Sequence, residues 1–167
     1  MFFGCGCFDI IHVGHVRYFE EAKKLGDMLV IGVNNDDSVR KLKGADRPII
    51  PENERAEIVY GIKGVDYVFL FPETNVSRYL RALEPHIFVK GNDWTMEKLN
   101  EEEKDAIRSY NGEIAIVPTY ITSSTSIVER IKTRKSEKLK NISKKQSSNN
   151  LLYSQLADKK LSIHLHF

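Results

Sequence analysis

The sequence predicts an α/β protein in which a doubly wound parallel sheet of about five strands carries helices on both faces. Three observations support this prediction: short apolar runs of strand length, helical patterns between them, and polar, glycine-containing segments directly after the strands. Continuous apolar runs are typical of strands buried on both faces. Alternation of strand and helix implies parallel pairing with right-handed crossovers.

The strands are expected at four apolar runs and at the start of the chain. The runs are MLVIGV at 28–33, VDYVFLF at 65–71, IFV at 87–89 and IAIV at 114–117. Only three residues precede Gly4. We therefore expect either a short first strand or a natural chain that begins upstream of Met1.

Helices are expected between these strands. Residues 15–25 place apolar side chains on one stripe and stop before Gly26, and residues 52–62 do the same after Pro51. Two further helix starts carry the Ser/Asn-x-x-Glu pattern of a capping box. These pairs are Asn100 with Glu103, before a helix ending near Gly112, and Ser126 with Glu129.

Composition and charge divide the 167-residue chain after residue 131. The composition, 41% hydrophobic and 29% charged, is that of an ordinary globular protein. Residues 132–150 carry a net charge of +6 and few apolar side chains, which predicts a disordered linker. We expect one domain at 1–131, this basic linker, and a C-terminal tail at 151–167 whose structure the sequence does not indicate.

The chain offers no sign of export or of a membrane span. No apolar run approaches the eighteen or so residues needed to cross a bilayer, and the N-terminus does not resemble a signal peptide. We expect a cytoplasmic protein. Cys5 and Cys7 would have to close a very small ring to form a disulfide, so we expect both to be reduced thiols.

The segment CGCFDIIHVGH, from Cys5 to His15, allows two kinds of site. Cys-x-Cys followed by His-x-x-His supplies four plausible zinc ligands. As a turn between a strand and a helix, the same segment instead resembles a phosphate-binding loop: Gly6 allows close approach, and helix N–H groups favour anions. His12 and His15, three residues apart, can then donate hydrogen bonds to phosphate oxygens.

Polar residues follow the other strands as well, and in a parallel sheet these segments meet at one edge. They read NNDD at 34–37, KGNDW at 90–94 and TSSTS at 122–126. Asp9 and Asp93 are candidates for holding Mg²⁺ or a ligand hydroxyl. Trp94, the only tryptophan, is a candidate for stacking on a base or lining a pocket. The hydroxyls at 124–126 are candidates for helix caps or phosphate donors.

GCFDIIHVGH resembles the G-x-F-D-x-x-H-x-G-H signature of the cytidylyltransferase-like nucleotidyltransferases, and the resemblance covers residues 4–131. The further matching segments are LGDMLVIGVNNDDSVRKLKG, RPIIPENERAEIV, VDYVFLF, FVKGNDW and SSTS. The resemblance implies a Rossmann-like fold of the HUP type. Within the family, the chain is most similar to the adenylyltransferase domains that make ADP-heptose from heptose 1-phosphate and ATP for lipopolysaccharide core synthesis.

The resemblance also implies roles for individual residues. His12 and His15 would stabilise the transition state, Lys43 or its neighbour Lys41 would neutralise phosphate charge, and Arg55 would lie near the substrates. Mg²⁺ would accompany the ATP or CTP; on the chemistry of the sequence alone, Asp9 is a candidate contact for it. The implied nucleotide-binding residues are Gly6, Cys7, Phe8, Asp9, Gly14, Gly91, Asp93, Trp94, Ser124, Thr125 and Ser126.

The implied reaction is in-line attack on the α-phosphorus with release of pyrophosphate. Expected partners are a nucleoside triphosphate and a phosphorylated sugar or alcohol, with no nucleic acid or membrane, and a homodimer is expected. Alternatives are a CTP-dependent enzyme acting on glycerol 3-phosphate or phosphoethanolamine, an FAD synthetase, and a non-enzymatic nucleotide-binding module. Thr119 stands where the glycerol enzymes have arginine, which weakens the CTP alternative. A dinucleotide oxidoreductase is disfavoured because the third glycine of G-x-G-x-x-G is missing.

Overall fold

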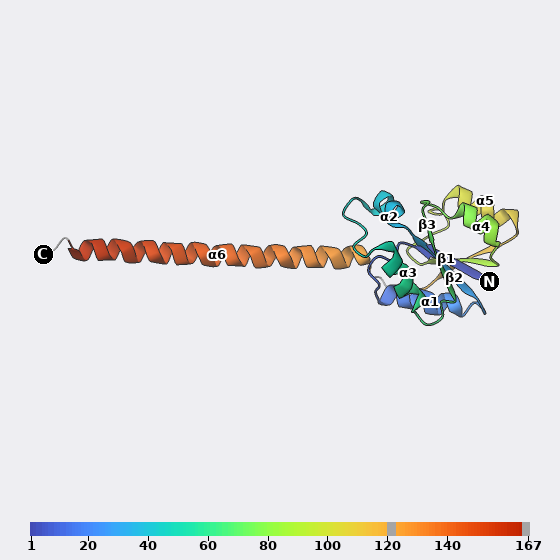
Figure 1. Cartoon of the computed structure of the whole chain (residues 1–167), viewed down its shortest axis with the longest axis horizontal. Coiled ribbons are helices and arrows are strands. Elements are labelled where there is room, and N and C mark those ends of the chain that lie inside the picture. Colours follow the sequence, from blue (N-terminus) through green and yellow to red (C-terminus); the bar gives the residue numbers. More distant parts are fainter. Residues whose placement is uncertain (120–122, 165–167) are drawn as a thin grey trace. The chain divides into compact units, whose positions relative to one another are not determined.

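A computed structural model describes residues 1–119 and 123–164 of the chain, with side-chain surroundings up to residue 146 (Figure 1). The chain divides into two compact units, Met1–Ser124 and Thr125–Phe167. Each unit is described by itself below.

The first unit is built on a five-stranded sheet in the order β3-β2-β1-β4-β5. Every neighbouring pair is parallel, which confirms the predicted sheet type. Each predicted apolar run forms a strand, and the first strand is short. The strands are β1 Phe2–Gly6, β2 Leu29–Asn34, β3 Tyr67–Phe71, β4 Ile87–Gly91 and β5 Glu113–Val117.

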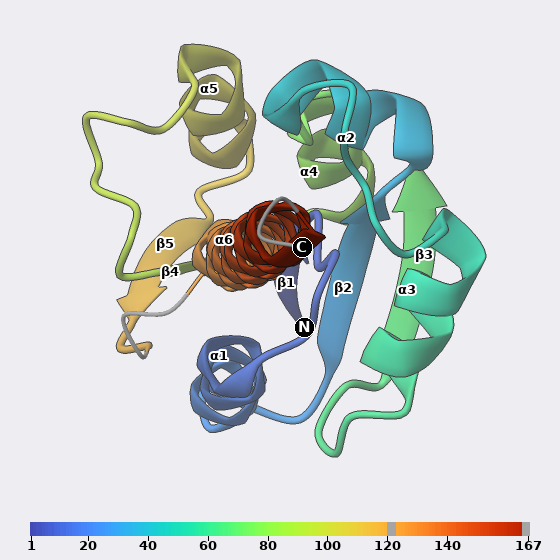
Figure 2. The ribbon, with the colours of Figure 1, turned by 90° about the vertical axis from the view of Figure 1, so that its left-hand side faces the viewer.

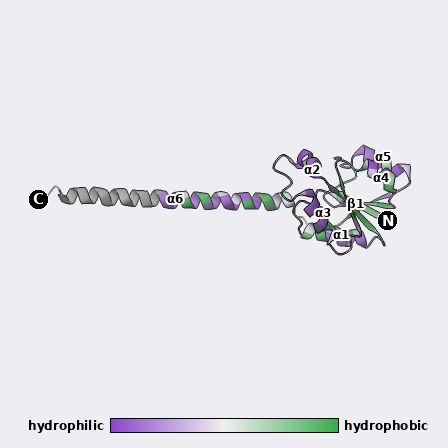
Figure 3. Ribbon diagram, in the orientation of Figure 1, coloured by the Kyte–Doolittle hydropathy of each residue, from purple (hydrophilic) through white to green (hydrophobic). Residues whose placement is uncertain are grey.

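Helices cover both faces of this sheet, as expected for a doubly wound fold (Figure 2). Helices α1 (Val13–Lys23) and α3 (Glu52–Tyr60) lie on one face, and α4 (Ser77–Leu83) and α5 (Glu101–Ser109) lie on the other. Two separate apolar clusters fill the spaces between sheet and helices. The strands are accordingly the most hydrophobic elements of this unit (Figure 3).

The predicted helices at 15–25, 52–62 and after Asn100 are present, and two helices were not predicted. Helix α2 (Asp36–Lys43) begins inside NNDD, where the side chain of Asn35 accepts a hydrogen bond from the N–H of Ser38 at 2.9 Å. Helix α4 has only seven residues, too few for a clear helical period. Polar loops and short helices share residue types, so composition alone does not separate them.

The predicted capping box of Asn100 and Glu103 is confirmed for Asn100 only. Asn100 caps α5 by accepting from the N–H of Glu102 at 2.8 Å. Glu103 does not complete a capping box with Asn100, because its carboxylate accepts from the N–H of Val76 at 3.1 Å and lies 3.8 Å from Nζ of Lys90. Glu103 therefore joins α5 to α4 and to β4.

The second unit is helical, which corrects the prediction of a disordered linker at 132–150. Helix α6 runs over Ser124–His164, and it begins two residues before Ser126, the predicted cap. The segment contains no glycine or proline, so nothing in its backbone chemistry interrupts a helix, although its polar composition resembles that of a disordered chain. The first unit ends at Ser124, seven residues before the predicted boundary.

No helix among the described residues is both long enough and apolar enough to cross a membrane.

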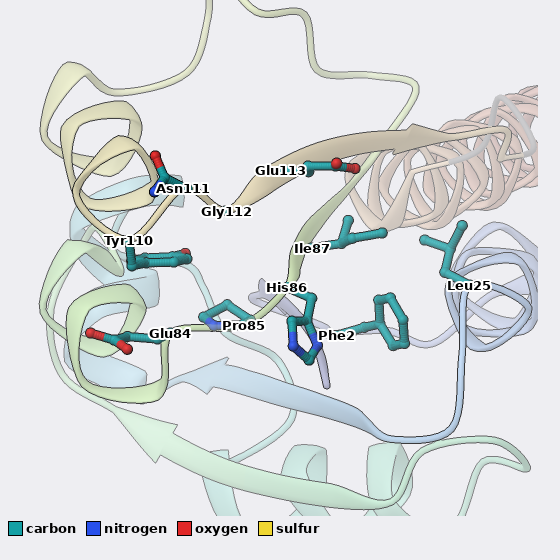
Figure 4. A pocket seen from close by; sticks show the side chains of 10 residues that line it. All are labelled: Phe2, Leu25, Glu84, Pro85, His86, Ile87, Tyr110, Asn111, Gly112 and Glu113. Carbon is teal, nitrogen blue, oxygen red and sulfur yellow. The ribbon is translucent and has the colours of Figure 1, made fainter.

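The two edges of the sheet differ in shape. The loops after β1, β2 and β4 gather at the carboxyl edge. At the amino edge there is a hollow of about 600 Å³ (Figure 4). Its lining consists of Phe2, Leu25, Glu84, Pro85, His86, Ile87, Tyr110, Asn111, Gly112 and Glu113.

Candidate active site

The loop after β1 leads directly into the N-terminus of α1. Phe8 adopts a left-handed backbone with φ of 46°, and its side chain is buried against Phe19, with ring centroids 5.2 Å apart. A Cβ atom at Gly6 would lie 3.1 Å from the Phe8 ring, so only glycine fits without displacing it. Anchoring the phenyl ring inside fixes the course of the loop backbone, as a phosphate-binding turn requires.

The two histidines of the H-x-G-H motif lie together at the start of α1. His12 is the N-cap residue, and its Nδ1 accepts a hydrogen bond from the N–H of Gly14 at 3.1 Å. A neutral His12 therefore carries its proton on Nε2. The His15 ring stacks on that of His12, with centroids 3.9 Å apart and planes 21° apart. The structure thus brings the predicted pair together, one turn apart on one face.

Both imidazoles are neutral near pH 7. Burial lowers the pKa of His12, and burial together with the nearby His12 lowers the pKa of His15 to about 4. Nδ1 of His15 is buried and has no hydrogen-bond partner within the part of the chain that is described. A neutral imidazole can donate a hydrogen bond to a phosphate oxygen. A buried nitrogen without a hydrogen-bond partner is rare in proteins unless a ligand or a water molecule binds to it.

Asp9 holds a neighbouring segment in place. It is 1% exposed, and its Oδ1 accepts from the N–H groups of Ile49 and Ile50 at 2.7 and 2.9 Å. Its Oδ2 pairs with Nε of Arg47. Both oxygens thus accept hydrogen bonds from residues 47–50. The Mg²⁺ contact expected at Asp9 stays a prediction. Its role in this geometry is to attach residues 47–50 to the loop after β1.

Arg47 was not singled out from the sequence, yet it connects two predicted site segments. Besides Asp9, it donates from Nη2 to Oγ of Ser124 at 2.9 Å, and its side chain is buried. Ser124 is thereby brought to the loop after β1. Thr125 and Ser126, also predicted to bind the nucleotide, belong to the second unit. Arg47 follows GAD in a polar stretch, and no local pattern distinguishes it from a surface arginine.

Arg55 is completely buried, unlike a residue that meets a substrate in solvent. Its Nε donates to the carbonyl of Ile50 at 2.9 Å, Nη1 donates to the carbonyl of Cys7, and Nη2 pairs with Asp36 at 2.8 Å. The guanidinium therefore ties together three loops of the carboxyl edge. The sequence prediction placed Arg55 beside the substrates, whereas the structure places it beneath the loops that would hold them.

Lys43, a predicted site residue at the end of α2, is exposed. Burial raises the pKa of the Cys7 thiol in the loop after β1, and the positive charge of Lys43 opposes this shift. A role of Lys43 in neutralising phosphate charge stays a prediction. The neighbouring Lys41 is also exposed.

The cysteines do not form a metal site with the histidines. Burial raises the pKa of Cys5 as well as that of Cys7, so both are neutral thiols near pH 7. Across the described ranges, no group of three or more His, Cys, Asp or Glu side chains is placed to hold a metal ion. The phosphate-loop interpretation of CGCFDIIHVGH therefore prevails over the zinc interpretation.

The loop after β4 carries the predicted nucleoside residues. Trp94 returns over the strand end, where its backbone N–H donates to the carbonyl of Gly91 at 3.0 Å. A Cβ atom at Gly91 would lie 2.8 Å from Oδ1 of Asp93, so a larger residue here would require the exposed Asp93 side chain to move. Asn92 and Thr119 exchange two hydrogen bonds that join this loop to the one after β5. The Trp94 side chain remains 37% exposed.

Lys90, beneath that tryptophan, was not predicted as a site residue. It is 5% exposed, and its Nζ lies 4.4 Å from the ring centroid of Trp94 and 4.5 Å from that of Phe88. The only signal in the sequence is a charge at the end of the apolar run IFVK, where a buried strand would otherwise continue.

The fold and the site together define an α/β protein with an H-x-G-H phosphate loop at the carboxyl edge of a parallel sheet. The chain belongs to the cytidylyltransferase-like family, whose model matches residues 3–144.

Curated relatives share more than two fifths of their aligned residues with this chain. The protein named "Bifunctional protein HldE" from Geotalea uraniireducens is 45% identical over 130 residues, and its namesake from Syntrophotalea carbinolica is also 45% identical over 130 residues. In both cases the match covers 77% of this chain and 26% of the relative. The chain thus spans about a quarter of the length of these proteins.

Solved structures agree with the fold. The lipopolysaccharide core biosynthesis protein from Thermoplasma volcanium is 32% identical with a TM-score of 0.58, covering 73% of this chain and 97% of that one. A protein of unknown function from Archaeoglobus fulgidus, 21% identical with a TM-score of 0.55, covers 74% of this chain and 91% of that one, and shares the fold.

Proposed function

We propose that the protein transfers AMP from ATP to heptose 1-phosphate, giving ADP-heptose and pyrophosphate. The observation that carries this proposal is the pair of neutral, stacked histidines at the N-terminus of α1, directly after the loop that follows β1. The choice of sugar and nucleotide is supported by the resemblance to ADP-heptose-forming domains. The relatives named HldE and the lipopolysaccharide core biosynthesis protein agree with it.

In the proposed mechanism, an oxygen of the sugar phosphate attacks the α-phosphorus of ATP in line with the leaving group. A bond forms between that oxygen and the α-phosphorus, the bond from the α-phosphorus to the bridging oxygen breaks, and pyrophosphate leaves. His12 and His15 donate hydrogen bonds to the phosphate oxygens as charge shifts onto them, and the N–H groups of α1 add their dipole. Lys43 neutralises charge on the triphosphate.

Most of the rate enhancement then comes from position and electrostatics, as in other phosphoryl and nucleotidyl transfers. Arg55, Asp9 and Arg47 act indirectly, because they hold the loops. No covalent intermediate with the protein is required.

Mg²⁺ is proposed to arrive with the triphosphate. The described residues contain no group of three or more His, Cys, Asp or Glu side chains placed to hold a metal ion. Mg²⁺ prefers phosphate and water oxygens with few protein ligands, so this donor set is compatible with a metal carried by the nucleotide. The metal then enters and leaves as part of the substrate.

The proposal is tested by measuring pyrophosphate release with ATP and with CTP. Each nucleotide is combined with heptose 1-phosphate, glycerol 3-phosphate, phosphoethanolamine or FMN. We expect release with ATP and heptose 1-phosphate. Release with CTP and glycerol 3-phosphate would contradict the proposal in favour of a cytidylyltransferase, and release with FMN would indicate FAD synthesis. Nucleotide binding without release in any combination would indicate a binding module.

We further propose that the protein works in the cytoplasm as a homodimer acting on small molecules. Light scattering of the full chain at micromolar concentration measures the assembly directly, and a monomer mass would contradict this part of the proposal.

A further inference from the structure

Lys90 is an unusual residue for the interior of a parallel sheet. Its ammonium group is almost completely buried at the carboxyl end of β4, and its partners are poorly placed for a charge. The nearest carboxylate oxygen, on Glu103, is 3.8 Å away, and Sγ of Cys5 is 3.6 Å away. Burying a cation is costly unless close oxygens meet it, and an apolar side chain of similar size is often as stable. The packing of the core therefore does not explain the charge.

Two aromatic faces also contact this ammonium. Nζ lies 4.5 Å from the ring centroid of Phe88 and 4.4 Å from that of Trp94, well within the range of cation–π attraction. Phe88 is fully buried in the core, whereas Trp94 is 37% exposed. The ammonium thus attaches a partly exposed loop side chain to a ring that the core holds fixed.

Trp94 needs such an attachment because its loop has few others. Between Gly91 and Leu99, the described hydrogen bonds include a turn at Trp94, another at Lys98, a contact from Lys98 to the Asp93 carbonyl, the Asn92 pair with Thr119 and a side-chain contact of Thr95 with Glu97. None of these bonds involves the indole ring. The contact with the buried Lys90 therefore helps to hold the ring in place.

The position of the indole matters because of where the loop lies. β4 pairs with β1 in the sheet, so the loop after β4 neighbours the loop that carries Gly6 and leads to the histidines. An indole that contacts a cation and is 37% exposed offers part of a flat apolar surface beside the phosphate loop. A nucleoside base stacks well on such a surface.

We propose that Lys90 is a positioning residue that fixes the indole of Trp94 as the wall of the nucleoside subsite. The inference rests on the nucleotide binding proposed above. It adds a specific expectation: removing the ammonium weakens nucleotide binding while leaving the chemical step nearly unchanged, because Lys90 itself touches neither the phosphates nor the histidines.

The chain offers a direct reporter, because Trp94 is its only tryptophan. Intrinsic fluorescence of the full chain therefore reports on this one side chain. The first measurement is acrylamide quenching without nucleotide in the wild type, Lys90→Met and Lys90→Arg. We expect the quenching constant of Lys90→Met to rise about twofold, and that of Lys90→Arg to stay near the wild-type value, because a guanidinium also stacks on aromatic faces.

The second measurement is a titration of Trp94 fluorescence with ATP, followed by steady-state kinetics. For Lys90→Met we expect the Kd for ATP to rise about fivefold, the change expected from one cation–π contact, with kcat at saturating ATP within about twofold of the wild type. Lys90→Arg should recover most of the affinity. Lys104→Met is the matched control: it removes a lysine of α5 that pairs with Glu101 at 2.6 Å, and it should change neither measurement.

Lys90→Met leaves the buried Glu103 carboxylate without a cation. If this variant does not fold, the double variant Lys90→Met/Glu103→Gln replaces it in both measurements. Unchanged quenching in a folded variant would overturn the proposal, since Lys90 would not hold Trp94. Raised quenching with an unchanged Kd would also overturn it, since the indole would not line the subsite. If the wild type binds ATP but releases no pyrophosphate with any acceptor, the proposed reaction fails, while the Kd values still decide the role of Lys90.

Discussion

The two edges of the sheet differ in a way that separates shape from chemistry. The amino edge carries a hollow of about 600 Å³, yet its polar groups, such as His86 and Tyr110, lie apart from any phosphate-binding turn. The carboxyl edge carries paired histidines, a glycine turn and buried arginines that fix the surrounding loops. The comparison suggests a criterion for the proposed site: hydrogen-bond donors that converge on one place identify it better than the depth of a depression.

The largest difference in turnover between the two edges is expected when one histidine at each edge is replaced. His15→Ala removes a donor from the proposed transition state, and we expect kcat to fall by roughly 10²-fold or more with the fold intact. His86→Ala at the amino edge should leave kcat unchanged. Pyrophosphate release and circular dichroism measure the two effects. Near-normal turnover by His15→Ala would remove His15 from the mechanism.

A second test concerns the buried arginine beneath the loops. Arg55→Leu leaves two carbonyl groups and the Asp36 carboxylate without their donors, so we expect the free energy of unfolding to fall by about 3 kcal/mol. Urea denaturation measures this loss. Arg78→Leu, which removes an exposed ion pair with Glu73, should cost less than about 0.5 kcal/mol. Equal effects of the two changes would contradict the anchoring role of Arg55.

His15, at the carboxyl edge, should also make the stability of the protein depend on pH. The pKa of His15 is lowered to about 4 in the folded state, from a value near 6.5 when exposed. Between these values the unfolded chain binds more protons, so His15 makes stability fall as pH decreases from about 6.5 towards 4. We expect the melting temperature of His15→Ala to depend less on pH over this window than that of the wild type. Parallel melting curves across the window would contradict a buried neutral His15.

The smallest effect is expected at the amino edge. The hydroxyl of Tyr110 is buried without a hydrogen-bond partner among the residues the structure describes, and burial raises the pKa of this side chain to about 12. Tyr110→Phe removes an unsatisfied group, so we expect stability to stay the same or rise by up to about 1 kcal/mol, with unchanged turnover. Thermal unfolding and pyrophosphate release measure both. A marked loss of turnover would show that the amino edge takes part in function.

The parallel sheet could be predicted from the sequence because its strands are continuous apolar runs, a pattern that few other structures share. The H-x-G-H loop could be found because its residues are adjacent in the chain. The roles of Asp9 and Arg55 could not be predicted, because their partners lie about 20 to 50 residues away and only folding brings them together. Lys90 escaped detection for a different reason: Trp94 is only four residues further along the chain, but the contact between its ring and the ammonium depends on the turn after β4.

The cross-linking of loops by Arg55 has a consequence for the energetics of binding. One guanidinium contacts the segments after β1, after β2 and before α3, so these segments become ordered together when the chain folds. Ordering a loop costs conformational entropy. In this protein the cost lowers the free energy of unfolding and not the affinity for a ligand, because the loops are ordered when the chain folds. Under the proposed function, a nucleotide would meet loops that are already ordered, and its interaction energy would remain available for the reacting phosphate.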